Sequence, residues 1–165
     1  LKKISITVDK LLSEDEEAGF IYELPLRNTA VSYIDRIQTI PLGAGTMTLY
    51  PPKAESKEND NCICVLFAVE NYDILITGDR TATGEWELVR NTELPDVDIL
   101  IAGHHGSKYS TSQFLLDAVK PKTVVISVGK NNIYGHPAPE LLERLELYHC
   151  RILRTDLNGT VVFRR

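Results

Sequence analysis

The chain has 165 residues, of which 43% are hydrophobic and 25% are charged, an ordinary composition for a soluble globular protein. This length suits one domain with a sizeable core, so we expect residues 1–165 to form a single unit. The 18 lysines and arginines against 23 aspartates and glutamates give a net charge of −5, which argues against a broadly basic nucleic-acid surface.

The start of the chain carries no recognisable targeting signal. Its first residues lead straight into a strand-like alternation, and no apolar run approaches the roughly 18 residues of a membrane helix. Because the chain begins with Leu1 and not with methionine, we expect it to be a piece of a longer protein, whose location these absences leave open.

The three cysteines are Cys62, Cys64 and Cys150. An odd and small number favours free or buried thiols over disulfide bridges or a zinc knot. Cys62 and Cys64 alternate with apolar residues in a strand pattern, so we expect them on the same face of a strand.

The first part of the chain predicts mostly strands. Residues 3–8 alternate as a strand does, and the acidic run 13–17 is typical of a solvated face or the first turn of a helix. We expect a loop and a helix within residues 18–38. Residues 37–50 read as a hairpin or meander around residues 42–45, and residues 54–61 as a polar loop.

From residue 62 onward the pattern sharpens into alternating strands and helices. Residues 62–69 and 72–77 predict a hairpin that turns at Glu70 and Asn71. Further strands are expected over 97–102 and 123–128, and helices over 80–90, 110–119 and 139–148. A final hairpin is expected from 151–154 and 160–163 around Asn158 and Gly159. The order favours one layered α/β domain.

Three of the predicted strands end at a glycine close to a side chain that can bind metal. The first leads to Asp79, the second to His104 and His105, and the third, through a loop, to His136. Because parallel strands end at a common edge of a sheet, these side chains can share one site. Carboxylate and imidazole donors suit Zn²⁺ or Mn²⁺, which lower the pKa of a bound water to roughly 7.

Each of these residues also has a structural alternative. Asp79 could cap a helix that starts at Arg80. His104 and His105 should point to opposite sides of a strand end, where Gly103 and Gly106 would leave room for a metal or a phosphate, but such a pair can be incidental.

The remaining two histidines have alternatives of the same kind. His136 could be an ordinary turn histidine, although Asn131 and Asn132 nearby could contact an anionic substrate. We read His149, near the end of a helix, as a surface residue. A histidine outside the ligand set could shuttle protons.

A resemblance rests on four stretches: residues 75–79, 104–107, 127–137 and 154–159. Together they resemble a metallo-β-lactamase-fold hydrolase, and more narrowly the C-terminal hydrolase domain of ComEC-type competence DNA-uptake proteins. The resemblance is specific over residues 59–165 and weak before Tyr50. It implies an αββα sandwich that is N-terminally truncated, because the family's opening His-x-His-x-Asp-His motif is absent and with it part of the metal site.

The resemblance also implies roles for individual residues. Asp79, His104 and His136 match metal positions, although the choice between His104 and His105 as ligand stays open, and His105 is the expected proton donor. Four further residues are expected to contact the phosphate: Ser107, Lys108, Asn131 and Tyr134.

The implied function is metal-dependent hydrolysis of a phosphodiester during DNA uptake. The expected substrate is single-stranded DNA, the expected cofactor is Zn²⁺ or Mn²⁺, which this fragment could lack, and the parent protein is expected in a bacterial cytoplasmic membrane. Two alternatives remain: a hydrolase of a small ester such as a lactam, lactone or phosphorylcholine, and a non-catalytic domain that keeps the fold.

Overall fold

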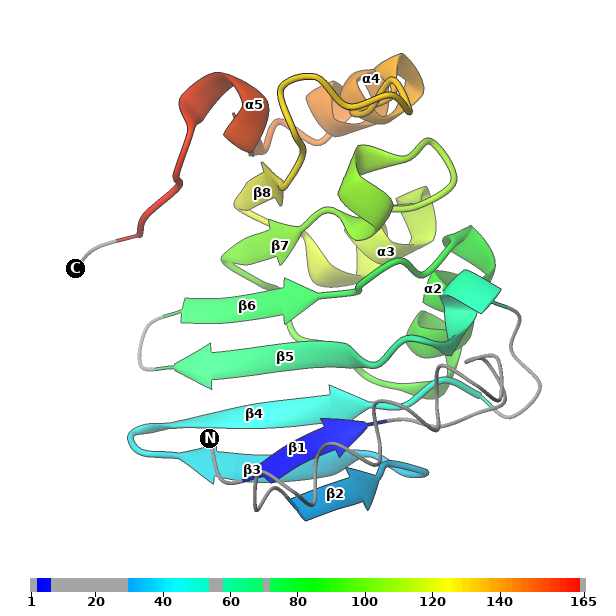
Figure 1. Ribbon diagram of the computed structural model, residues 1–165, viewed down its shortest axis with the longest axis vertical. Helices are drawn as coiled ribbons and strands as arrows, with labels where there is room; N and C mark the ends of the chain where they lie inside the picture. The colour runs from blue at the N-terminus through cyan, green and yellow to red at the C-terminus, as the bar shows by residue number, and fades with distance from the viewer. Residues whose placement is uncertain (1–2, 7–29, 54–57, 70–71, 164–165) are drawn as a thin grey trace.

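A seven-stranded mixed sheet forms the body of the computed structural model, which describes residues 3–6, 30–53, 58–69 and 72–163 (Figure 1). The strands follow the order β3-β4-β5-β6-β7-β8-β9. A separate two-stranded parallel sheet pairs β1 (Lys3–Ile6) with β2 (Ala30–Tyr33). The bounds of the main strands are β3 Gln38–Leu42, β4 Gly45–Tyr50, β5 Cys64–Val69, β6 Tyr72–Ile76, β7 Ile99–Ile101, β8 Thr123–Ile126 and β9 Arg151–Arg154.

The sheet changes character in its middle. Strands β3 to β6 pair antiparallel with one another in order, which confirms the paired strands expected over 37–50 and 62–77. Strands β6 to β9 are parallel. The three helices α2 (Ala82–Asn91), α3 (Gln113–Val119) and α4 (Pro139–Leu147) lie in the crossovers of this parallel part. Parallel strands need such crossovers, and they bring the strand ends to a common edge.

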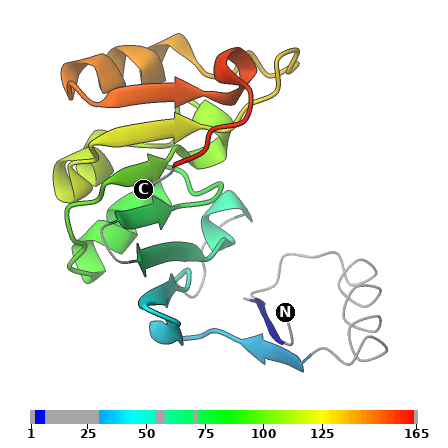
Figure 2. The same ribbon diagram turned by 90° about the vertical axis from the view of Figure 1, so that its left-hand side faces the viewer.

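One face of the sheet forms the core with the helices. Leu75, Leu100 and Val124 are aligned across β6, β7 and β8, and all three are fully buried. They pack with buried residues of α2, α3 and α4, and Figure 2 shows these helices gathered on one side of the sheet. The three helices predicted after residue 79 are therefore confirmed. Their starts follow from capping, because the hydroxyls of Thr81 and Ser112 accept N–H bonds in the first turns of α2 and α3.

The opposite face of the sheet is also apolar but less buried. Ile74, Ile76 and Ile101 point to this face, since they alternate with the core residues of the same strands, and each is half-buried. The continuous apolar runs of these strands are thus explained by two apolar faces.

The predicted final hairpin is wrong. β9 pairs in parallel with β8, and residues 155–158 form the short helix α5 (Thr155–Asn158). The Asn158 side chain accepts the Arg154 N–H, and the Gly159 N–H bonds to the Thr155 carbonyl, so the dipeptide closes a helical turn. No strand occurs over residues 160–163.

Parts of the early predictions fall outside the described residues. These include the acidic run 13–17, the turn at 70–71 and most of 18–38. The described end of that last stretch, Ala30–Tyr33, is a strand and not a helix. The expected polar loop contains a 3₁₀ turn, Glu58–Asn61. The cysteines carry free thiols, as expected, and both Cys62 and Cys64 donate to the Thr77 carbonyl.

Candidate functional site

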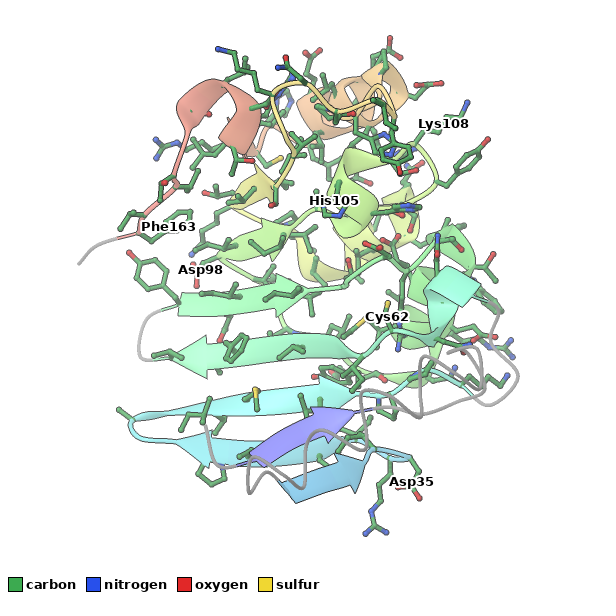
Figure 3. All side chains as sticks on the ribbon, in the orientation of Figure 1. Asp35, Cys62, Asp98, His105, Lys108 and Phe163 are labelled. Carbon is green, nitrogen blue, oxygen red and sulfur yellow. The ribbon has the colours of Figure 1, made fainter. Side chains whose placement is uncertain are left out.

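The chemically versatile residues lie where the three parallel strands β6, β7 and β8 end. Gly78 and Asp79 follow β6, the turn Gly103–Gly106 follows β7, and Ser127 follows β8. In Figure 3 the labelled His105 stands near this edge, and Asp98 marks the opposite end of β7. The predicted convergence of three segments at one edge is a direct result of parallel pairing.

The paired histidines occupy an unusual backbone conformation. His104 has φ 49° and ψ 45°, and His105 has φ 54° and ψ 23°, so both are left-handed. The expectation that they alternate across a strand end is therefore wrong, because β7 ends at Ile101 and a 3₁₀ turn follows. Left-handed residues other than glycine cost about 1–2 kcal/mol each. Such conformations persist where surrounding contacts hold them and concentrate at functional sites.

Backbone hydrogen bonds hold this turn against the neighbouring strand ends. The His104 N–H donates to the Gly78 carbonyl at 3.0 Å, and the Ala138 N–H donates to the Gly106 carbonyl at 2.9 Å. The turn after β7 is thus tied to the turn after β6 and to the segment that follows His136.

The glycines beside the pair serve packing and not ligand access, contrary to the expectation. A Cβ on Gly106 would lie 2.8 Å from Pro137 Cβ and 2.9 Å from Ile126 Cγ2. A Cβ on Gly103 would lie 3.1 Å from Ser110 Cβ. The space that these glycines leave is filled by the protein's own side chains.

His105 is oriented by a hydrogen bond to the backbone. Its Nδ1 lies 2.9 Å from the Ser127 carbonyl oxygen, which can only accept. Nδ1 therefore carries the proton, and in the neutral ring Nε2 keeps a lone pair. A backbone carbonyl orients many metal-binding and catalytic histidines in this way.

His104 and His136 form a close pair with unpartnered nitrogens. Their ring centroids are 5.9 Å apart in an edge-to-face arrangement. The Nδ1 atoms of both rings are buried and have no hydrogen-bond partner among the described residues. An unmade hydrogen bond at a buried nitrogen is costly, so these atoms are candidate ligands for an ion.

His136 is fixed by its own loop. Its N–H donates to Asn132 Oδ1 at 2.8 Å, and Asn132 Nδ2 donates back to the His136 carbonyl at 2.6 Å. Burial, together with the nearby His104 and His105, holds the pKa of His136 below its ordinary value of 6.5. The ring is therefore neutral at neutral pH, the form that can bind a metal.

A pocket of about 450 Å³ opens beside these rings. None of the described residues that line it carries a carboxylate, so an anion entering it meets no fixed negative charge from its walls. The lining residues are His105, Ser127, Val128, Gly129, Asn132, Tyr134, His136 and Thr155.

Asp79 lies next to this site without joining the imidazoles. The alternative that it caps a helix is wrong, since α2 begins at Ala82 and Thr81 is its cap. The Asp79 side chain is exposed, directly after the Gly78 carbonyl that binds His104. Within the described ranges, no three histidine, cysteine, aspartate or glutamate side chains cluster closely enough to hold an ion. Metal binding by His104, His136 and Asp79 therefore stays a prediction.

The four expected phosphate contacts are placed differently from one another. Tyr134 lines the pocket. Asn131 and Lys108 are exposed outside it, and Lys108 pairs with Glu140 at 3.7 Å. Ser107 is buried, and its hydroxyl accepts the Tyr109 N–H within its own turn.

A buried glutamate and a half-buried arginine, both missed by sequence reasoning, hold the loop after the histidines. The carboxylate of Glu85 on α2 accepts the N–H groups of Thr111 at 2.6 Å and Ser112 at 2.7 Å. Arg144 on α4 donates to the carbonyls of Ser110 and Thr111, both at 3.0 Å. Burial raises the pKa of Glu85, while these N–H bonds and Arg144 oppose the rise. A helical glutamate gives no sequence signal of such a role.

Thr155 was also missed as a pocket residue, whereas Asn132, which was expected to contact an anionic substrate, does line the pocket. Thr155 accepts the Val128 N–H at 2.8 Å and so ties α5 to the segment after β8. Its place in the stretch 154–159, on which the resemblance partly rests, was the available signal.

Comparisons with known proteins give relatives of one kind. No protein-family model matches the chain. It is 33% identical over 156 residues to ComE operon protein 3 of Bacillus subtilis, covering 94% of this chain and 19% of that protein. It is 34% identical over 114 residues to Recombination protein 2 of Haemophilus influenzae, covering 68% of this chain and 14% of that protein. It is 35% identical over 117 residues to Competence protein ComA of Neisseria gonorrhoeae, covering 70% of this chain and 17% of that protein. The chain thus spans about a fifth or less of these relatives.

Solved structures show the fold. CmlA, a diiron β-hydroxylase from Streptomyces venezuelae, superposes with a TM-score of 0.60 and 15% identity over 92% of this chain and 38% of that chain. The E377D mutant of CmlA superposes with a TM-score of 0.61 and 14% identity, over the same shares of the two chains. At this identity the likeness concerns the fold alone, which is that of the metallo-β-lactamases, as the resemblance implied.

None of the helices in the described segments combines the length and the apolar character that crossing a bilayer needs.

The packing of Gly106 can be tested by substitution. We expect Gly106→Ala to lower the free energy of unfolding by about 2–4 kcal/mol, because the new methyl group meets Pro137 and Ile126 at a backbone φ of +90°. Urea unfolding of both proteins measures this difference. Gly129→Ala is the matched control, since a Cβ there meets nothing within 4 Å, and its effect should stay within about 0.5 kcal/mol. Equal effects of the two substitutions would contradict the packing role.

The titration of His136 gives a second test. In the metal-free chain, its ring resonances in NMR should titrate below pH 6.5. A base whose pKa is lowered by folding stabilises the fold above its unfolded pKa, and this contribution is lost as the pH falls below about 6.5. We therefore expect the free energy of unfolding to decline between about pH 7 and about pH 5, and to decline less in His136→Gln. A His136 pKa at or above 6.5 would refute the buried, neutral assignment.

Proposed function

We propose that this chain, a homologue of the ComEC-type competence proteins with a metallo-β-lactamase fold, is a metal-dependent hydrolase of phosphodiester bonds in DNA. The observation that carries the proposal is a pair of neighbouring imidazoles with unpartnered buried nitrogens beside a pocket without carboxylates. Metal-assisted hydrolysis of a phosphodiester needs both features, a place for a cation and room for an anionic substrate.

We assign His104, His136 and Asp79 as the residues that would hold Zn²⁺ or Mn²⁺. His104 and His136 offer neutral imidazole nitrogens, and Asp79 is the carboxylate next in sequence to the Gly78 carbonyl bound by His104. A divalent ion bound there supplies Lewis acidity toward a phosphoryl oxygen. Further ligands would come from outside the described residues.

His105 is the proposed proton donor to the leaving oxygen. Its Nδ1 proton is committed to the Ser127 carbonyl, so proton transfer takes place at Nε2. The ring lines the pocket and is exposed, which lets it reach a substrate and exchange protons with water. Loss of the Ser127 bond would free the ring to rotate and reduce the fraction of correctly placed Nε2 atoms.

The remaining predicted contacts divide into two roles. Tyr134 in the pocket wall is a proposed direct contact, and the exposed Lys108 and Asn131 are proposed contacts to outer phosphates. Ser107 has its hydroxyl engaged inside its turn, so we assign it to holding the histidine turn in shape.

The competence role of the relatives extends the proposal to DNA uptake. The N. gonorrhoeae relative is named Competence protein ComA, and the B. subtilis relative is named ComE operon protein 3. We propose that this chain cleaves single-stranded DNA in that process, as part of a protein that is embedded in the membrane elsewhere along its length.

The proposal is tested by assaying the full natural protein that contains this sequence, with Mn²⁺ or Zn²⁺, on labelled single-stranded DNA and on a small phosphodiester. We expect cleavage that is lost on metal removal with EDTA and reduced at least about 100-fold by His136→Ala and by Asp79→Ala. His149→Ala is the control, because His149 lies outside the pocket lining and should leave the rate unchanged.

Other outcomes would favour the alternatives. Turnover of a lactone, a lactam or a phosphorylcholine ester but not of DNA would indicate a small-ester hydrolase. Absence of bound metal by elemental analysis, together with absence of turnover, would indicate a non-catalytic domain. Unchanged DNA cleavage in Asp79→Ala and His136→Ala would overturn the assigned ligands.

A further inference from the structure

We propose that Tyr134 and Ile133 form a stacking platform for unpaired nucleobases, and that this platform makes the site select single-stranded over double-stranded DNA. The inference deepens the proposed function and rests on it. It assigns the choice of substrate to a loop outside the imidazole cluster, residues 129–135 between β8 and His136.

The first observation is that two large apolar side chains are exposed on a braced loop. Ile133 is 88% exposed and Tyr134 is 77% exposed. The loop is nevertheless closed by Asn132, whose N–H and Nδ2 both donate to the Gly129 carbonyl at 3.2 Å and whose side chain also bonds His136. Exposed apolar groups on a loop held in this way indicate a contact surface, since folding alone gains nothing from their position.

The second observation is the orientation of the Tyr134 ring. It lies nearly parallel to the His136 imidazole, with an interplanar angle of 24° and centroids 6.1 Å apart. Because the side chain is largely exposed, the ring keeps a free face toward solvent. A flat, preoriented aromatic face is what a nucleobase stacks on, whatever its sequence.

The third observation concerns charge. Tyr134 belongs to the wall of the carboxylate-free pocket together with His105 and His136. Lys130, in the same loop, forms no ion pair within the part of the chain that the structure describes. A nucleotide whose base stacks on Tyr134 therefore has its phosphate next to the pocket, whose described lining offers two imidazoles and no carboxylate.

A second exposed aromatic residue lies in the loop after the histidine turn. Tyr109 is 65% exposed, and the Lys108 ammonium lies 5.2 Å from its ring centroid. Lys108 pairs with Glu140 at the start of α4, shortly after His136, so the two loops are neighbours. Aromatic rings interleaved with lysines match the chemistry of a nucleic acid strand better than that of an apolar protein surface.

The platform excludes duplex DNA for a simple reason. In a duplex both faces of each base are already stacked, and only the ends offer a free face. An unpaired strand offers every base, and stacking on an aromatic side chain contributes roughly a tenfold gain in affinity per base.

The test is a binding measurement without metal, so that cleavage does not interfere. Fluorescence anisotropy of the full natural protein in EDTA would compare three labelled ligands: an oligothymidylate, an abasic strand of the same length, and a blunt hairpin duplex. We expect the oligothymidylate to bind about tenfold more tightly than the abasic strand and the duplex. Tyr134→Ala should remove this preference, Tyr134→Phe should keep it, and Leu157→Ala, which removes another exposed apolar side chain, should not change it.

Several results would overturn the platform. These are equal affinity of the native protein for base-bearing and abasic strands, an equal loss for both strands in Tyr134→Ala, or binding of an apolar peptide at this loop in preference to DNA. Cleavage separates this failure from that of the proposed function. If the native protein with metal cleaves the abasic strand as fast as the oligothymidylate, the platform fails while the hydrolase stands. If it cleaves neither strand, the proposed hydrolase activity is refuted, and the binding measurement in EDTA still tests the stacking platform.

Discussion

The parallel pairing of β6, β7 and β8 is the constraint on which the site depends. It brings three chain segments to one edge, and two backbone hydrogen bonds then join them, from His104 to Gly78 and from Ala138 to Gly106. These bonds hold two successive histidines in a left-handed turn that the residues would not adopt alone. The position of the imidazoles is therefore a property of the sheet edge and not of the local sequence.

Charge is used differently inside and outside the site. The loop after the histidines is held by the buried Glu85 and the half-buried Arg144, each bonded to backbone groups of that loop. Lysines at the opposite end of the sheet are neutralised in pairs, as in Lys122 with Asp98 at 2.7 Å, which lowers the pKa of Asp98. Among the residues that the structure describes, those that line the pocket carry imidazole, hydroxyl, amide and apolar groups and no carboxylate. Although the protein has a net charge of −5, an anion in this pocket therefore meets no carboxylate from the described lining residues.

The sequence predicts those features that depend on periodicity. The apolar runs that end at Thr77 and Ala102 are long enough to define buried strands, and their ends locate Asp79 and His104 at one edge. Prediction from the sequence fails where the same residues favour two different local structures. Asn158 and Gly159 favour a hairpin, yet the Asn158 side chain closes a helical turn instead. It also fails where only tertiary contacts decide, because nothing local distinguishes Gly106, which meets Pro137, from a glycine that leaves room for a ligand.

The central claim is that His104 and His136 together receive a divalent cation, and the four histidines of the chain allow a direct test. Mn²⁺ broadens the NMR signals of rings that lie near it. When Mn²⁺ is added to the protein in small steps, the ring signals of His104 and His136 should broaden first, and the exposed His149 last. Simultaneous broadening of all four rings, or broadening of His149 before the pair, would contradict the claim.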